Sequence, residues 1–220
     1  MTYLIGEYTR LYGQVTIGDG CLVEDNVIIG HPAPGDLRAV LTSLASCGNL
    51  TDIFDAAASR ATRIGDDSII RSGTIIYAGT SIGDRFDCGH NVIIRENVTL
   101  GNGVYVKNNT EIMKDVLVGN DCRLAGVVAD NCRIGDAVSS FGVLTHTYRS
   151  YVPPRGHSEP DDRPMLEAPT LEHGSIVGRG ALVIGSCVVG RDAVVAGNAI
   201  VRMNVPPGYL AVGNGRLIKR

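Results

Sequence analysis

An exact period of six residues, held from Ile64 to Arg123, constrains the fold of this chain more than any other feature of its sequence. Consecutive blocks open on an aliphatic residue or a small apolar substitute: Ile64, Ile70, Ile76, Ile82, Cys88, Ile94, Leu100, Val106, Ile112 and Val118. The fifth residue of a block is usually small or β-branched, and Gly followed by Asp or Asn often comes directly after the opening residue. A period of six fits neither the turn of a helix nor the simple alternation of a hairpin. Self-similarity at a fixed period therefore predicts a repeat architecture.

The block pattern predicts short strands joined by corners. Side chains alternate along a strand, so the first and fifth residues of a block point to the same face. Gly, Asn and Asp tolerate the backbone angles of the turns between strands. Three blocks, about eighteen residues, close one triangular coil, and coils stack roughly 4.8 Å apart so that each buries its aliphatic residues against the next. The predicted fold is an all-β parallel β-helix, a three-sided prism that forms one domain over residues 1–220.

The same pattern resembles that of the hexapeptide-repeat acyltransferases. Two segments are similar to the branch of that family that acylates amino groups of sugars and sugar nucleotides: Ile70-Arg-Ser-Gly-Thr-Ile-Ile-Tyr-Ala-Gly79 and Gly89-His-Asn-Val-Ile-Ile-Arg-Glu-Asn97. Asn204 to Asn214 resembles the family's closing motif, although the usual Gly-Asn-Pro-Ala reads Gly213-Asn-Gly-Arg216. The resemblance implies a left-handed winding, an acyl-CoA donor with acetyl as the expected group, and a homotrimer whose active sites lie between subunits.

Composition and charge narrow the classes of partner. A hydrophobic share of 44% and a charged share of 20% over 220 residues are typical of a folded domain with an ample core. The net charge of -3 gives no reason to expect nucleic acid or an anionic membrane as partner. The first residues lack the pattern of a signal peptide and no apolar run approaches a membrane span, so we expect a cytoplasmic protein. Five cysteines fall on inward places and are predicted to be buried, reduced thiols: Cys21, Cys88, Cys122, Cys132 and Cys187. Cys47 lies in an interruption of the period, and its state is not predicted.

Two interruptions of the period, at about residues 31–62 and 145–170, are predicted to leave the prism as insertions. In the first, we expect Asp36 to cap a helix and a second short helix to run from Thr51 to Ser59. The second is polar and proline-rich, and long loops on a rigid scaffold are often functional. The resemblance implies that it reaches over an active site shared between subunits. A shortened block at Leu124–Val127 predicts a tightened corner.

The spacing of the blocks also predicts which polar residues stack. Residues about eighteen apart should lie on the same corner of successive coils, one strand spacing apart. His90 and Asn108 then form a column with Ser72, and Glu96 lies beneath Lys114. A histidine beside an amide is a candidate general base, although a corner histidine bonded to backbone or water is also consistent with this position. We expect Asn108 and Glu96 to contact an acceptor substrate.

His146 is the stronger candidate for the general base. It stands where the prism gives way to the second insertion, in Leu144-Thr-His-Thr-Tyr-Arg149, and this junction often reads Thr-Asn-Asp in the branch that the chain resembles. Other hexapeptide acetyltransferases use a histidine near such a loop to take a proton from the acceptor as it attacks a thioester carbonyl. Tyr148 and Arg149 are predicted to bind the acceptor beside it. Which of His146 and His90 acts as base stays open here.

The donor and the alternative functions complete the sequence-based predictions. By resemblance, Gly178, Arg179, Ala196 and Gly197 bind the donor's pantetheine arm, and Arg202 or Lys219 lies near its phosphates. Transfer to a hydroxyl of a sugar or an antibiotic is the first alternative. A metal-dependent hydratase of the γ-carbonic-anhydrase type is a second, but no two histidines stand five apart as in those enzymes, and no metal site is predicted. The third is a non-catalytic scaffold, because fold does not fix function.

Overall fold

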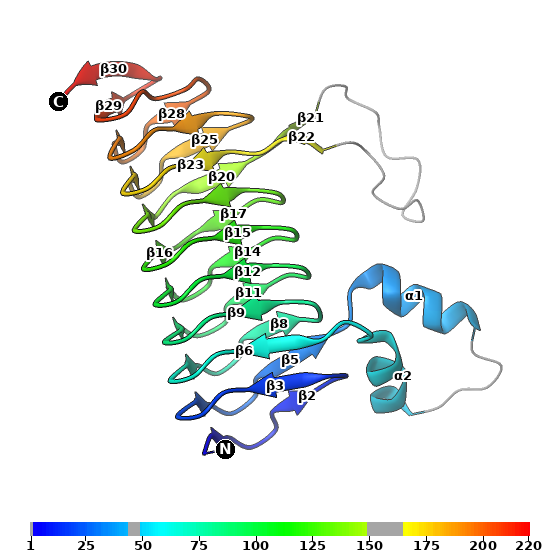
Figure 1. Ribbon diagram of the computed structural model, residues 1–220. Helices are drawn as coiled ribbons and strands as arrows, with labels where there is room; N and C mark the ends of the chain where they lie inside the picture. The colour runs from blue at the N-terminus through cyan, green and yellow to red at the C-terminus, as the bar shows by residue number, and fades with distance from the viewer. Residues whose placement is uncertain (1, 44–48, 149–164) are drawn as a thin grey trace.

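The chain winds into a three-sided prism of stacked β-coils, with its two termini at opposite ends (Figure 1). A computed structural model describes residues 2–43, 49–148 and 165–220. Within these residues the strands form three long sheets of 11, 9 and 8 strands and one two-stranded pair. Each coil contributes one strand to each long sheet in turn, which we call sheets 1, 2 and 3. The corners between them are corner 1–2, corner 2–3 and corner 3–1.

Nearly all strands are two to four residues long and pair in parallel with the strand one coil away. Sheet 1 contains β1 (Leu4–Ile5), β4 (Leu22–Val23), β7 (Ile69–Ile70), β10 (Asp87–Cys88), β13 (Tyr105–Val106), β16 (Arg123–Leu124), β19 (Ser139–Ser140), β24 (Ile176–Val177), β27 (Val194–Val195), β29 (Tyr209–Val212) and β30 (Arg216–Lys219). Sheet 2 contains β2 (Arg10–Leu11), β5 (Ile28–His31), β8 (Ile75–Tyr77), β11 (Ile93–Ile94), β14 (Glu111–Ile112), β17 (Val127–Val128), β20 (Val143–Thr145), β25 (Leu182–Ile184) and β28 (Ile200–Val201). Sheet 3 contains β3 (Val15–Ile17), β6 (Thr62–Ile64), β9 (Ser81–Ile82), β12 (Thr99–Leu100), β15 (Leu117–Val118), β18 (Arg133–Ile134), β23 (Thr170–Leu171) and β26 (Val188–Val189). The predicted all-β parallel β-helix is confirmed, whereas its left-handed winding and its extent as one domain stay predictions.

The core follows the six-residue period. Opening residues such as Ile70, Ile94 and Val106 are fully buried, and so are fifth residues such as Val92 and Val116. Each aliphatic side chain therefore packs on its equivalent one coil away, which removes apolar surface from water along the whole axis of the prism.

The corners explain why Gly and then Asp or Asn follow the opening residue. At corner 3–1, the Asp66 backbone N–H donates to Asp84 Oδ1 at 3.0 Å, and the Asp84 N–H donates to Asn102 Oδ1 at 2.8 Å. Each Asx side chain thus satisfies a backbone donor of the preceding coil. A Cβ on Gly65 would lie 2.4 Å from Asp84 Oδ1, so only glycine leaves room for this contact. The corner pattern in the sequence is consequently a hydrogen-bonded ladder that fixes the coil-to-coil register.

Two coils are shorter than the rest at corner 1–2. The Lys114 N–H donates to the Asp130 carboxylate 16 positions on, where the regular spacing is 18. The predicted tightening at Leu124–Val127 is confirmed, and a second four-residue block runs from Ser140 to Val143. A Cβ on Gly126 would lie 2.4 Å from the Gly142 carbonyl oxygen, because the two short turns stack closely.

The first insertion holds two helices, α1 (Pro34–Ser43) and α2 (Leu50–Ala57). The expectation that Asp36 caps α1 is wrong, because the helix begins two residues earlier and the Asp36 carboxylate instead bonds Arg60 at 2.6 Å. The α2 helix begins before Thr51, where Asn49 Oδ1 accepts the Asp52 N–H, and ends short of Ser59. Phe54 of α2 contacts the rings of Tyr12 and His31, so this insertion packs on the prism.

The second insertion begins and ends with an antiparallel pair, β21 (Thr147–Tyr148) and β22 (Met165–Glu167). Its central residues, 149–164, lie outside the described part of the chain. At the C-terminal end, β30 folds back antiparallel on β29 and closes sheet 1.

The five cysteines at inward places are buried free thiols, as predicted, and Cys47 lies outside the described residues. Burial raises the pKa of Cys122 to about 11 and that of Cys132 to about 12, so both stay protonated at neutral pH. In the described part of the chain, no helix is long and apolar enough to cross a membrane.

Candidate functional site

The predicted site residues separate onto two corners of the prism. Glu96 and His146 lie at corner 2–3, each two residues beyond a buried residue of sheet 2. His90 and Asn108 lie at corner 1–2, two residues beyond sheet 1. The structure therefore does not bring the two candidate bases together.

Corner 2–3 carries a column of four ionisable side chains on consecutive coils. The register of sheet 2 aligns Ile94, Ile112, Val128 and Leu144, which places the column as Glu96, Lys114, Asp130 and His146. The Lys114 N–H donates to Asp130 Oδ1 at 3.0 Å, and the Asn131 N–H donates to the Lys114 carbonyl at 3.1 Å, which confirms this order. Acidic and basic groups thus alternate at one strand spacing, about 4.8 Å.

The acidic members of this column are buried. Glu96 is 8% exposed and Asp130 is 9% exposed. Carboxylates are seldom buried unless they are paired. Glu96 is paired: Arg95 Nε donates to Glu96 Oε2 at 2.8 Å, and Arg95 Nη2 donates to Glu96 Oε1 at 3.1 Å. This two-bond geometry fixes the Arg95 guanidinium at the corner.

Asp130 is a buried carboxyl whose pKa is shifted at this corner. Desolvation by burial raises the pKa of Asp130, and the hydrogen bond from the Lys114 N–H and the charges of Lys114, His146 and Arg95 oppose that rise. A buried carboxyl with a raised pKa beside a histidine is a common feature of functional sites. His146 itself is partly buried, and its Nδ1 atom is buried.

An aromatic stack continues the corner toward the first insertion. The Arg95 guanidinium lies 4.7 Å from the centroid of the Tyr77 ring, and the Tyr77 ring lies 4.7 Å from that of His31. The His31 ring contacts Phe54 of α2 at 5.2 Å, its Nδ1 lies 2.9 Å from the Pro32 carbonyl, and desolvation lowers the pKa of His31. The helices are thereby joined to the column through packed rings.

Both insertions leave the prism on the same side. Figure 1 shows the α1–α2 pair and the β21–β22 pair projecting from one side of the prism, at different heights along its axis. The first insertion follows His31 at the end of β5, and the second follows His146 beyond the end of β20. Because both strands end at corner 2–3, the coils that carry Glu96, Lys114 and Asp130 lie between the two projections.

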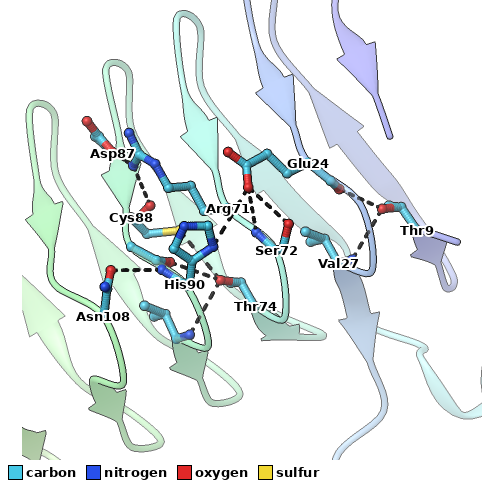
Figure 2. Close-up of polar contacts among 12 residues, drawn as sticks. Thr9, Glu24, Val27, Arg71, Ser72, Thr74, Asp87, Cys88, His90 and Asn108 are labelled. Carbon is cyan, nitrogen blue, oxygen red and sulfur yellow. Dashed lines mark hydrogen bonds and ion pairs between the residues drawn. The ribbon is translucent and has the colours of Figure 1, made fainter. Parts of the chain in front are cut away.

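Corner 1–2 holds His90 in a different setting (Figure 2). Asn108 Oδ1 accepts the backbone N–H of His90 at 3.0 Å, so this amide is a rung of the corner ladder. His90 Nδ1 lies 3.8 Å from Glu24 Oε2, and the His90 side chain is 49% exposed. That same carboxylate oxygen accepts the Ser72 N–H and the Ser72 hydroxyl, both at 3.0 Å, and the hydrogen bond from the Ser72 N–H lowers the pKa of Glu24. Arg71 beside them bonds Asp87 and the Cys88 carbonyl.

The residues predicted to bind the donor also divide between corners. Gly178, Arg179, Ala196 and Gly197 continue corner 1–2 on later coils. Arg202 follows β28 at corner 2–3, where it lines a depression of about 370 Å³ with Ile200, Met203, Asn214 and Gly215. Lys219 lies in β30.

Some predicted residues cannot be placed in the site. Arg149 lies outside the described residues, and for Tyr148 only the backbone, in β21, is described. Among residues 2–43, 49–148 and 165–220, no group of three or more His, Cys, Asp or Glu side chains could hold a metal ion.

Asp130 was not among the residues predicted from the sequence, because two coils are shorter than the regular period. Counting eighteen residues on from Lys114 gives Cys132, which is a buried core residue, whereas the observed 16-residue coil gives Asp130. The four-residue block at Leu124 was the signal that could have corrected the count.

The chain is similar in sequence to curated proteins over about half its length. It is 32% identical over 117 residues to the Bifunctional protein GlmU of Trichormus variabilis, and 32% identical over 117 residues to that of a Nostoc species. These matches cover 51% of this chain but only 24% of each relative, so the chain matches about a quarter of the length of these proteins. No family model matches the chain.

Solved structures to which the chain is similar include proteins named as acyltransferases. The UDP-N-acetylglucosamine acyltransferase from Campylobacter jejuni is 13% identical, with a TM-score of 0.47 over 96% of this chain and 72% of that one. The UDP-N-acetylglucosamine O-acyltransferase (LpxA) from Moraxella catarrhalis is 15% identical, with a TM-score of 0.48 over 97% of this chain and 70% of that one. The sequence similarity to GlmU over about half of the chain supports the predicted resemblance to the hexapeptide-repeat acyltransferases.

Proposed function

We propose that the chain is an acyltransferase that moves an acyl group, with acetyl as the expected group, from an acyl-CoA to an amino group of a sugar or sugar nucleotide. The observation that carries this proposal is the column at corner 2–3, in which a buried acid precedes a partly buried histidine on consecutive coils. The sequence similarity to GlmU and the six-residue repeat support the same class of chemistry.

His146 acts as general base in the proposed reaction. Its imidazole takes a proton from the acceptor nitrogen as that nitrogen attacks the thioester carbonyl carbon. The C–N bond forms, the C–S bond of the tetrahedral intermediate breaks, and the imidazolium returns the proton to the leaving thiolate. The products are an amide and free CoA. Asp130 is the positioning residue, because its carboxylate interacts electrostatically with His146 and stabilises the transient imidazolium.

Glu96, Arg95 and Lys114 line the same corner and are suited to the acceptor. A sugar offers hydroxyl groups that both donate and accept hydrogen bonds, and a sugar nucleotide adds phosphates. Arg95 is held rigidly by Glu96 and Tyr77, which lowers the entropic cost of using it as a donor. Tyr148 and Arg149 remain part of this proposal as acceptor-binding residues beside the base.

Residues at two different corners are proposed to bind the donor beside His146. Arg202 lies at corner 2–3 two coils beyond His146, at roughly 10 Å along the axis, and would meet the donor's phosphates. Gly178, Arg179, Ala196 and Gly197 lie across sheet 2 at corner 1–2, so one prism alone does not bring them beside His146.

A homotrimer would resolve this separation. The outer face of sheet 2 is apolar over most of its height, with Ile75, Ile93, Val127, Val143, Leu182 and Ile200 all partly buried. The outer face of sheet 3 instead carries residues such as Arg63, Ser81 and Thr99. Covering the apolar face with a second prism would place corner 1–2 of one subunit against corner 2–3 of the next. A cytoplasmic location completes the proposal.

The proposal is tested by supplying acetyl-CoA with a panel of amino sugars and their UDP derivatives, each paired with the matching sugar that has a hydroxyl in place of the amine. We expect release of free CoA that depends on the amine, and a product heavier by one acetyl group in mass spectrometry. Release of free CoA with the hydroxyl sugars alone would show that the acyl group is transferred to oxygen and not to nitrogen. If no acyl-CoA is consumed with any acceptor, the proposed function is wrong.

A further inference from the structure

A basic and aromatic hollow lies on the outer face of sheet 1, away from the column that carries His146. It has a volume of about 560 Å³ and is lined by Gly103, Tyr105, Lys107, Asp121, Arg123 and Phe141. Sites for small ligands commonly occupy 300–1,000 Å³, so the hollow has the size of such a site.

The short coils create this hollow. Lys107, Ala125 and Phe141 follow sheet 1 on three consecutive coils, as the hydrogen bonds from their backbone N–H groups to Leu124, Ser140 and Val177 show. The two later coils turn into sheet 2 within four-residue blocks, and the middle coil presents only the methyl group of Ala125. Lys107 reaches across this notch, so that its Nζ lies 4.9 Å from the centroid of the Phe141 ring.

The side chains of the hollow offer two kinds of contact at once. Tyr105 and Arg123 are direct neighbours in the register of sheet 1, and both are exposed. Among the described residues, no side chain forms a hydrogen bond or an ion pair with the Arg123 guanidinium or the Lys107 ammonium. Asp121 is the single carboxylate, and its Oδ1 lies against the backbone of Gly103, 2.5 Å from where a Cβ would stand. The hollow therefore presents two cationic side chains and two aromatic rings, with a single carboxylate among them.

We propose that this hollow binds a nucleotide, with the phosphates on Arg123 and Lys107 and the base against Phe141 and Tyr105. A guanidinium presents paired donors that match a phosphate, and an ammonium adds a point charge. Flat aromatic faces favour a stacked ring, and every nucleobase has one. Nucleotide binding in the hollow depends on residues of sheet 1 and is independent of which group the enzyme transfers. Only its source among the substrates, a sugar nucleotide or the nucleotide end of the acyl donor, rests on the proposed function.

Equilibrium titration calorimetry on the full chain tests this without requiring turnover. The probes are UDP, adenosine 3′,5′-bisphosphate, inorganic pyrophosphate and uridine. We expect one of the two nucleotides to bind at least about tenfold more tightly than pyrophosphate or uridine, because only a nucleotide uses both the cations and the rings. Preference for UDP identifies the acceptor as the source. Preference for the bisphosphate identifies the donor, and would move the contact with the donor's phosphates from Arg202 to Arg123 and Lys107.

The variants Arg123→Gln, Lys107→Gln and Phe141→Ala should each weaken nucleotide binding by about tenfold, and Phe141→Tyr should retain it. The matched control is Arg63→Gln, which removes another exposed, outward arginine, from sheet 3, and should bind as the unaltered chain does. Circular dichroism confirms that each variant is folded. Absence of nucleotide binding, binding equal to that of pyrophosphate, or equal affinity in the Arg123→Gln and Arg63→Gln variants would overturn the proposal. A chain that binds nucleotide but consumes no acyl-CoA would separate this inference from the proposed function.

Discussion

Corners 1–2 and 2–3 each place a histidine near a carboxylate, yet they treat that pair differently. At corner 1–2, Glu24 is already occupied by two hydrogen bonds from Ser72, its pKa is lowered, and His90 is about half exposed. At corner 2–3, Asp130 is buried, its pKa is raised, and its charge interacts with His146. Both corners are built from the same repeat.

The difference teaches that hydrogen bonding and burial decide which histidine is a candidate for chemistry. A carboxylate that accepts several bonds in its charged form is stabilised as a structural acceptor. A carboxylate in a desolvated place, with fewer hydrogen bonds, is stabilised by a positive charge on a neighbouring histidine and stabilises that charge in turn. We therefore propose a structural role for the pair at corner 1–2 and a reactive one for the pair at corner 2–3.

Replacing the histidines gives the largest contrast. His146→Ala should lower kcat by about 10²- to 10⁴-fold, because general base catalysis typically contributes this much. His90→Ala should leave kcat unchanged. Initial rates of CoA release from acetyl-CoA measure both, with circular dichroism as the check on folding. Similar losses in the two variants, or a loss only in His90→Ala, would abolish the distinction between the corners.

Replacing the acid at corner 2–3 should separate activity from stability. Asp130→Asn keeps an acceptor for the Lys114 N–H but removes the charge, so kcat should fall by about tenfold to a hundredfold, the value of a charge-assisted contact. The raised pKa of Asp130 means that its ionised form costs stability above that pKa, and that this cost vanishes below the ordinary value of 3.8. Thermal melts should therefore show the variant as more stable than the unaltered chain at pH 7 and equal to it near pH 3. A variant that is less stable at pH 7 and fully active would contradict both expectations.

Removing a rung of the ladder at corner 1–2 should cost stability alone. Asn108→Ala leaves the His90 N–H without its acceptor and should lower the free energy of unfolding by about 1 kcal/mol, with kcat unchanged. Asn108→Asp keeps the oxygen and serves as the matched control, and Asn102→Ala removes an equivalent rung at corner 3–1. Urea denaturation measures the three variants. A large loss of kcat in Asn108→Ala, with stability unaltered, would move Asn108 from the ladder to the active site.

The smallest effect is expected for Glu24→Gln. Because the folded-state pKa of Glu24 is lowered from its ordinary value of 4.5, its contribution to stability is present above that value and is lost as the pH falls through the folded pKa. At pH 7 the variant should be less stable by roughly 0.5–1 kcal/mol, because a neutral amide accepts the bonds from Ser72 less strongly. The difference should close near pH 3. A difference that grows on acidification would show that the sign assigned to Glu24 is wrong.

Much of the fold was predictable because the period is read directly from the sequence. The inward places, the buried thiols and the stacking of Ser72, His90 and Asn108 all follow from counting six and eighteen. The helix boundaries were less predictable, since Asp36 bonds Arg60, which follows α2 in the same insertion, instead of capping α1. The column at corner 2–3 was predicted only in part, because Asp130 enters it through a coil that is two residues short.

The sequence by itself determined the repeat, and with it the strands, the corners and the apolar core, because each block satisfies its own backbone angles and side-chain alternation locally. Tertiary structure decided the grouping of Glu96, Lys114, Asp130 and His146 at one corner and of His90 and Asn108 at another. Which residue stacks on which depends on the summed lengths of all the coils between them. The loss of two residues in one turn therefore changes which later residues align with the earlier ones. A local pattern does not record that sum, and only the assembled prism shows which charges meet.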